Sequence, residues 1–335
     1  MFRIVKLDRS TLLRGMPFPA AAGAAVLAFL AGTVSPAGAM TFSQFTSVNA
    51  GGDNSSAWSR TGARVYYSSR SGGLPYMYYK DAGAPVGQDG SRLTSWFIDE
   101  FAISISGDDQ WAAMCAGDTI GFTHLWRCPA LGGPPLSQMT YGPFHYVHPD
   151  WWGSGSSQEV AFATSRGGAG FQIWTLKPNG ILPATQFTTV TGPGFEDLNP
   201  SFSPDGNSIV FSSNRAGGHQ LFVSHRNGAS WDPPVQLTSG GGEKSNPAWS
   251  PSGNYIAYQS GGGSETSLWL CESNGSNAQL ITSTGAFDAE PSWSPGTDKL
   301  AFTSDRTGAN YIWLAHQVST PAPTTTWGRI KNAYR

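Results

Sequence analysis

The chain has 335 residues, among them 42 glycines and 13 tryptophans, and only 13% of its residues are charged. Soluble domains usually carry about 25% charged residues, whereas abundant glycine and aromatic residues suit a protein with many turns and heavily packed sheets. The formal net charge is −2. Nucleic-acid binding depends on clustered Lys and Arg, so we exclude nucleic acid as a partner.

Residues 1–39 have the pattern of an export signal. Four basic residues precede an apolar stretch at 20–34, and Ala37-Gly38-Ala39 forms a small-x-small cleavage motif. The stretch is too short to span a bilayer comfortably, although a retained N-terminal anchor is the alternative interpretation. We therefore expect a periplasmic or secreted protein with no transmembrane segment after cleavage.

A motif recurs six times along the rest of the chain at a spacing of roughly 45 to 50 residues, which indicates repeated β-sheet blades. Its clearest copy is Asn-Pro-Ser-Phe-Ser-Pro-Asp-Gly at 199–206, in which Ser-Pro-Asp-Gly suits a type I turn. An apolar strand, a glycine-rich turn and another strand follow each copy. The six inner segments begin near Asn54, Glu100, His148, Asn199, Asn246 and Glu290.

A fourth strand in each repeat carries a Gln-x-Thr-like signature, which also occurs six times. The first copy, at 44–46, precedes the first inner segment, and none follows the last predicted strand at 311–314. The sequence therefore predicts an all-β protein, a six-bladed β-propeller of four-stranded antiparallel blades. We expect the N-terminal strand at 41–46 to complete the last blade and close the ring, which protects the sheet edges.

These motifs resemble the TolB-type repeat, a WD-like repeat also called PD40, over residues 41–316. The match is specific in blades four to six and weaker in the first three, where other turns replace Ser-Pro-Asp-Gly. The resemblance implies a stand-alone propeller without the separate α/β domain that precedes the propeller in TolB. The partners of TolB therefore do not transfer to this chain.

Positions at the start of each inner strand are expected to form a ring around the central channel, and they differ between copies. Their oxygen atoms and one imidazole suit a polar ligand or a hard cation such as calcium, although Asn and Glu there also serve as turn formers and caps. The candidate ligand-binding residues are Glu100, His148, Asn199, Asn246 and Glu290.

Two further sets of residues have structural interpretations. The repeat arginines Arg166, Arg215 and Arg306 follow the second strand and are expected to bond loop carbonyls or a neighbouring acid. Cys115 and Cys128 fall on consecutive strands of the second blade, so a cross-strand disulfide and two buried thiols are both open. Register decides between them, since a shift of one residue puts the sulfurs on opposite faces.

The sequence favours an interaction module, expected to be a monomer, that binds an envelope or extracellular protein, a polar ligand or a glycan at one face of the channel. The alternative is a metal-assisted hydrolase or lyase acting on a carbohydrate or small ester, with His148 as acid or base. Residues 319–335 form a Pro/Thr-rich linker and a short basic, aromatic tail, which is either a disordered end or a docking element.

Overall fold

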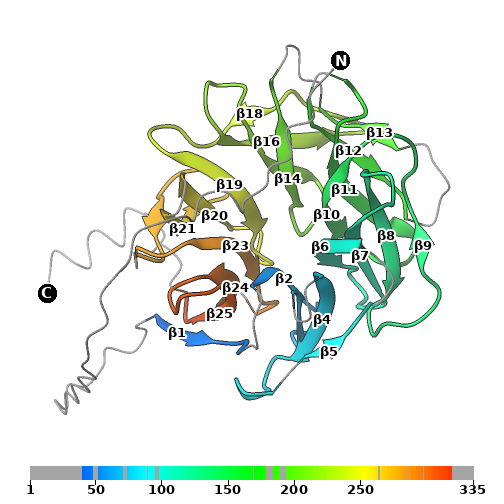
Figure 1. Ribbon diagram of the computed structural model, residues 1–335. Helices are drawn as coiled ribbons and strands as arrows, with labels where there is room; N and C mark the ends of the chain where they lie inside the picture. The colour runs from blue at the N-terminus through cyan, green and yellow to red at the C-terminus, as the bar shows by residue number, and fades with distance from the viewer. Residues whose placement is uncertain are drawn as a thin grey trace, which may run out of the picture. The chain divides into compact units, whose positions relative to one another are not determined.

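The computed structural model describes residues 40–47, 52–70, 74–88, 90–94, 98–168, 170–178, 184–188, 194–262, 265–283, 285–296 and 298–318. The predicted export signal and residues 319–335 lie outside this part of the chain. The described strands form six antiparallel sheets arranged radially, as blades, around a centre (Figure 1). This confirms the predicted six-bladed propeller.

Each blade runs outward from its inner strand, and the strand bounds are as follows. Blade 1 contains β2 (Asp53–Trp58), β3 (Arg64–Ser69), β4 (Tyr76–Asp81) and β5 (Ser91–Arg92). Blade 2 contains β6 (Ile98–Ile105), β7 (Trp111–Gly117), β8 (Thr123–Pro129) and β9 (Ser137–Gln138). Blade 3 contains β10 (Tyr146–Trp152), β11 (Glu159–Thr164), β12 (Gln172–Leu176) and β13 (Thr185–Gln186), with the 3-10 turn η1 (Gly155–Ser157) between its first two strands.

The other three blades follow the same order. Blade 4 contains β14 (Asp197–Phe202), β15 (Ser208–Ser213), β16 (Gln220–Asn227) and β18 (Val235–Gln236), and a short β17 (Ser230–Trp231) extends β16 as a hairpin. Blade 5 contains β19 (Glu243–Trp249), β20 (Tyr255–Gly262), β21 (Glu265–Glu272) and β22 (Gln279–Leu280). Blade 6 contains β23 (Asp288–Trp293), β24 (Lys299–Ser304), β25 (Tyr311–His316) and, from the other end of the chain, β1 (Thr41–Gln44).

Strand β1 closes the ring as predicted. It pairs antiparallel with β25, with Thr41 opposite His316 and Gln44 opposite Trp313. The Gln-x-Thr signature has a physical reason here, because Thr46 accepts a hydrogen bond from the backbone N–H of Ile312 at 3.0 Å. In the other five blades the corresponding threonine accepts the same bond from the third strand, at Thr94, Thr140, Thr188, Thr238 and Thr282.

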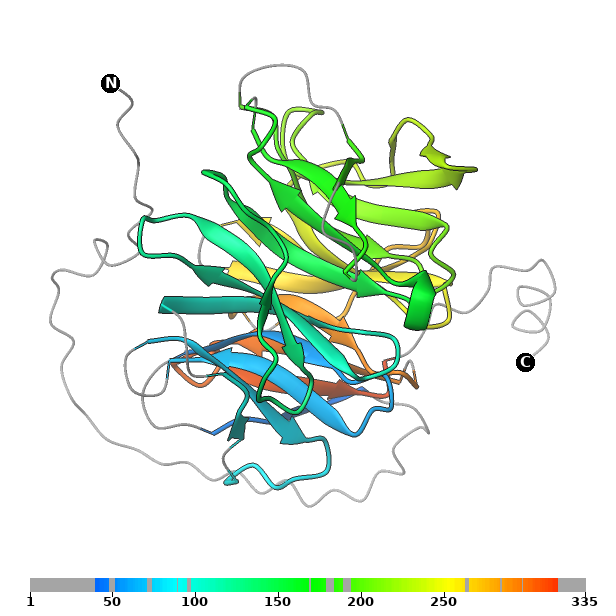
Figure 2. The same ribbon diagram turned by 90° about the vertical axis from the view of Figure 1, so that its right-hand side faces the viewer.

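The second strand of each blade lies between two others and is buried on both faces, which explains its apolar sequence. In β15, five of the six residues are buried, including Ile209, Val210 and Phe211. The side chains of successive residues pack into different interfaces between blades, so the core is divided into clusters that lie between neighbouring sheets. Figure 2 shows strands of the blades crossing the disc from one face to the other.

The disulfide alternative is wrong. Cys115 lies opposite Leu125 and Cys128 lies opposite Ala112, so the two thiols point to opposite faces of blade 2. Cys115 packs with residues of blade 3, whereas Cys128 packs with residues of blade 1. All three cysteines, Cys271 included, are buried and free.

The scaffold interpretation of the repeat arginines holds for two of them. Arg215 donates two hydrogen bonds to the carboxylate of Asp197, at 2.7 and 2.6 Å, and Arg306 binds Asp288 in the same way. Both carboxylates are buried, so each guanidinium compensates for a charge removed from water. Arg166 has no such acid, since Tyr146 occupies the corresponding position, and its guanidinium lies over the ring of Trp174.

Candidate functional site

The inner strand of every blade contains a β-bulge at the same repeat position. In β14, Leu198 pairs with Ser212 and Ser201 pairs with Val210, so two residues of the inner strand oppose one of its neighbour. The first bulged residue has a left-handed backbone, with φ between 48° and 56° in all six blades. These six residues, called the bulge ring below, are Ser55, Ala102, His148, Asn199, Asn246 and Glu290.

Four of the five candidate residues belong to the bulge ring, and Glu100 does not. Strand β6 has an additional bulge at Asp99, which displaces the register, so that Ala102 occupies the ring position in blade 2. Glu100 instead corresponds to the buried Asp197 of blade 4. Its carboxylate accepts hydrogen bonds from the backbone N–H of Met77 and the hydroxyl of Thr94, and it does not line the channel cavity.

A cavity of about 500 Å³ lies in the channel and is bounded at one end by the bulge ring. From there its lining follows the inner strands to the turns that join the first and second strands, at Arg60, Gly153, Pro204 and Pro251. Five residues of extended strand correspond to a depth of about 16 Å. The candidates His148, Asn199, Asn246 and Glu290 therefore lie at the inner end of the cavity, below the face of the disc that carries these turns, called the turn face below.

One half of the bulge ring is engaged in hydrogen bonds between blades. Glu290 Oε2 accepts hydrogen bonds from the backbone N–H of Ser55, at 2.8 Å, and from the hydroxyl of Thr303, at 3.0 Å. Gln259 accepts bonds from the side-chain amide of Asn246, at 2.8 Å, and from the backbone N–H of Glu290, at 3.1 Å. This network joins blades 5, 6 and 1, so Asn246 and Glu290 have a structural role beside any binding role.

The other half of the ring, at His148 and Asn199, is not engaged in this way. Within the described ranges the side chain of Asn199 makes no hydrogen bond, and the buried Nδ1 atom of His148 has no partner. Burial lowers the pKa of His148 from 6.5 to about 4, so its imidazole is neutral at pH 7. Both side chains line the cavity, and they come from the neighbouring strands β10 and β14.

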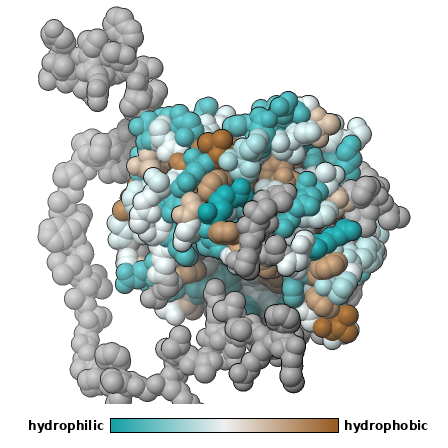
Figure 3. All heavy atoms as spheres, turned by 90° about the horizontal axis from the view of Figure 1, so that it is seen from above, coloured by the Kyte–Doolittle hydropathy of each residue, from teal (hydrophilic) through white to brown (hydrophobic). Residues whose placement is uncertain are grey.

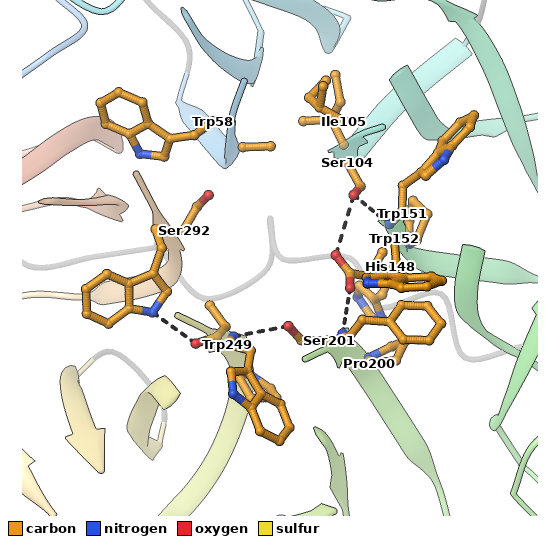
Figure 4. A pocket seen from close by; sticks show the side chains of 18 of the residues that line it. Trp58, Ser104, Ile105, His148, Trp151, Trp152, Pro200, Ser201, Trp249 and Ser292 are labelled. Atoms are coloured by element: carbon orange, nitrogen blue, oxygen red, sulfur yellow. Dashed lines mark hydrogen bonds between the residues drawn. The ribbon is translucent and has the colours of Figure 1, made fainter. Parts of the chain in front are cut away.

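Two residues beyond the bulge ring, side-chain oxygens join the inner strands of neighbouring blades. Ser104 accepts a hydrogen bond from the N–H of Trp151, Asp150 from that of Phe202 and Ser201 from that of Trp249, at 2.8, 2.7 and 3.1 Å (Figure 4). Asp150 is the only charged residue at this repeat position. Burial raises the pKa of its carboxyl, against the opposing effects of Phe202, Arg60 and Ser104.

The cavity beyond the bulge ring is lined by one cation and five tryptophans, of which three are buried. Arg60 reaches from blade 1 to the carbonyl of Trp151 in blade 3, with its Nη2 at 2.9 Å, and is the only Lys or Arg in the cavity lining. Trp152 and Trp249 are partly exposed, and their indole N–H groups are fixed on the carbonyls of Pro204 and Gly253. Gly206 lies against the Trp152 ring with φ of +71°, where no side chain fits.

The site matches calcium poorly. Calcium takes six to eight oxygen ligands, several of them carboxylates, whereas the bulge ring has a single carboxylate whose Oε2 atom already accepts two hydrogen bonds. In the described part of the chain, no group of three or more His, Cys, Asp or Glu residues is arranged to hold a metal ion. Calcium in the channel stays a prediction.

Arg60, Asp150 and the serines that join the blades were not among the candidates from sequence. Asp150 could have been found by aligning the repeats, because Ala or Ser occupies its position in the other five blades. Arg60 is harder to find by aligning the repeats, because the turn that contains it in blade 1 departs from the Ser-Pro-Asp-Gly motif.

Comparison with solved structures places this propeller among known ones. A putative TolB from Agrobacterium tumefaciens superposes with a TM-score of 0.60 at 19% identity, covering 81% of this chain and 91% of that one. The described chain has a TolB-like propeller fold. TolB from Acinetobacter baumannii gives a TM-score of 0.60 at 19% identity over 73% of this chain, which spans only 57% of that protein. A gluconolactonase from Xanthomonas campestris gives a TM-score of 0.57 at 14% identity, covering 80% and 86% of the two chains.

At these identities the structural comparisons show the fold alone. No protein-family model matches the chain, and no curated protein matches its sequence. Among the residues with described structure, no helix is long and apolar enough to cross a membrane.

Proposed function

We propose that this chain is an exported binding module, acting in the periplasm or outside the cell, that holds a polar ligand or a segment of a partner protein in the channel cavity. The observation that carries the proposal is the asymmetry of the bulge ring. Asn246 and Glu290 join blades, whereas the side chains of His148 and Asn199 line the cavity and make no hydrogen bond to the described residues.

The chemistry of the cavity suits a ligand with hydroxyl or amide groups. Because Nδ1 of His148 is buried, its neutral imidazole can offer a ligand only Nε2, as a donor or as an acceptor, whereas the carboxamide of Asn199 both donates and accepts. At the turn face, Trp152 and Trp249 offer apolar surface of the kind that packs on sugar rings and on protein side chains. Arg60 adds a positive charge there that favours a carboxylate or a carbonyl oxygen.

A hydrolase or lyase acting on a carbohydrate or a small ester is the alternative, and the propeller of the gluconolactonase is the observation in its favour. Two features of the site weigh against it. The lowered pKa of His148 keeps its imidazole in the neutral form at pH 7, so it lacks the imidazolium proton that a general acid transfers. Glu290 is held by Ser55 and Thr303, and Glu100, the other carboxylate among the candidates, lies outside the cavity.

The test is a pull-down from cell-envelope extract with the purified chain, combined with thermal-shift measurements against a panel of oligosaccharides. We expect bound material that is lost in a His148→Ala, Asn199→Ala double variant and kept in Leu280→Ala, an exposed site on the outer strand of blade 5. Equal binding by both variants would place the site elsewhere. Turnover of a sugar ester without a stable partner would favour the enzyme.

Export is tested separately by fractionating cells that produce the chain. We expect the protein in the periplasm or the medium, shortened by residues 1–39. A chain of full length in the cytoplasm would contradict this part of the proposal.

A further inference from the structure

A second cavity, called the blade 4–5 groove below, opens beside the channel and has a volume of about 620 Å³. It lies between blades 4 and 5 at the turn face, where its lining includes the turns at 203–205 and 252–253. Its apolar surface comes from Pro204, Val223, Val235, Leu237 and Trp249. Ser203, Pro204 and Trp249 line the channel cavity as well, so the two cavities meet at these residues.

The groove leaves apolar surface exposed to water. The Val235 side chain, on the outer strand β18, is 59% exposed, which ranks it among the most exposed large hydrophobic residues of the described chain. On the side of the molecule seen in Figure 3, apolar residues are scattered among hydrophilic ones. An apolar groove with a polar rim is typical of a surface that another segment covers.

The charge of the groove favours a basic segment. Its lining has one carboxylate, Asp205, and no Lys or Arg. Hydrogen bonds from Ser203 and Asn207 lower the pKa of Asp205, so this carboxylate is ionised at pH 7. His225 lies in the same lining, with its Nδ1 atom 2.8 Å from the hydroxyl of Ser208.

The described chain ends close to this groove. Val318 donates its backbone N–H to the carbonyl of Asp298 at 3.1 Å, and Asp298 belongs to the blade 6 turn that corresponds to Ser-Pro-Asp-Gly. The Val318 side chain is buried in the cluster between blades 5 and 6, which includes Ala248 of blade 5. The chain therefore leaves the propeller on the turn face, one blade away from the groove.

Residues 319–335 have the composition that the groove requires. They contain Trp327, Ile330 and Tyr334 together with three cations, and no acidic residue. The eight residues before Trp327 span up to about 26 Å when extended, whereas neighbouring sheets pack about 10 Å apart, so the linker is long enough. A short tether also gives an effective concentration in the millimolar range, so modest complementarity is sufficient for docking.

We propose that residues 327–335 of this chain dock into the blade 4–5 groove of the same molecule. Their apolar side chains cover Val235, Leu237 and Trp249, and their cations face Asp205.

The test replaces Trp327 by the photoreactive residue p-benzoylphenylalanine in the full chain, followed by irradiation at low micromolar concentration and peptide mapping. We expect crosslinks within one molecule to the segments around 223–237 and 249–253. Val235→Lys removes an apolar contact and adds a charge of the same sign as the segment, so it should reduce their yield about tenfold, the equivalent of about 1.4 kcal/mol. Leu280→Lys is the matched control, because Leu280 is 46% exposed on the outer strand of blade 5 and lies outside the groove.

A second variant distinguishes loss of docking from misfolding of the propeller. Reversing two charges of the segment, with Arg329→Glu and Lys331→Glu, changes no described residue and should also reduce the crosslinks. Crosslinks to another surface, crosslinks between molecules only, or a yield that neither variant changes would each overturn the proposal. Loss of channel binding in the His148, Asn199 variant does not affect these outcomes, so the two proposals fail independently.

Discussion

The neutral imidazole of His148 makes the stability of the propeller depend on pH in a predictable direction. Burial lowers the pKa of His148 from 6.5 to about 4 in the folded protein. Between these values the unfolded chain binds a proton that the folded chain does not, so the free energy of unfolding falls as the pH is lowered from about 6.5 towards 4. At 1.36 kcal/mol per pH unit, the shift corresponds to about 3 kcal/mol at most, and the partial exposure of His148 reduces this figure.

The matched variant is His148→Asn, because blades 4 and 5 carry Asn at the same ring position. Asn tolerates the left-handed backbone found there, with φ of 53°, and does not titrate. Asp150 and Glu290, the two acidic residues of the cavity lining, are present in both proteins. A difference between their pH profiles therefore comes from the histidine. The raised pKa of Asp150 opposes the effect, since it stabilises the folded state at low pH.

The assay is urea denaturation of both proteins at several pH values between about 4.5 and 7.5. We expect the wild-type chain to lose about 2 kcal/mol more than the variant over this range. If the two proteins have similar free energies of unfolding at pH 7, and the variant loses less towards pH 4.5, the result would support the lowered pKa of His148. Identical pH profiles would show that folding does not lower the pKa of His148, and the assignment of a buried imidazole that stays neutral down to about pH 4 would be refuted.

Other predictions concern the scaffold. Glu290→Ala should lower the free energy of unfolding by about 1–3 kcal/mol more than Asn199→Ala, measured by chemical denaturation, because only Glu290 satisfies a backbone N–H of the next blade. Asp288→Ala should cost about 3–5 kcal/mol by the same measurement, since it leaves Arg306 unpaired in a largely buried site, and a cost below about 1 kcal/mol would contradict the ion pair. All three thiols should react with a thiol reagent only after denaturation, and a reductant should not change the melting temperature.

The repeat pattern predicted the blades and the closing strand because each blade uses the same local signals. The hydrogen bond that closes the turn at 203–206 recurs at 59–62, 106–109 and 250–253, and the threonine after each outer strand accepts the same hydrogen bond in all six blades, so their recurrence is visible in the sequence. The repeat pattern did not predict the position of Glu100 correctly. A single additional residue, Asp99, shifts the register of β6, and a bulge leaves no mark in the residue types around it.

Contacts between blades could not be predicted either. Arg60 meets the carbonyl of Trp151 two blades away, and Asp150 meets the N–H of Phe202 in the next blade. Such pairs depend on how the sheets are placed in space, which no local pattern encodes. The division of the bulge ring into an engaged half and an open half arises from the same three-dimensional arrangement.

Ring closure also determines the order in which the chain can complete its fold. Ser43 and His316 share a hydrogen bond across 273 positions of sequence. A chain that emerges with its N-terminus first holds β1 unpaired until β25 has appeared, because β25 lies between β1 and β24 in blade 6. Until then the edges of β1 and β24 that bind β25 are both open to pairing with another molecule. Completion of the last blade is the event that removes this aggregation hazard.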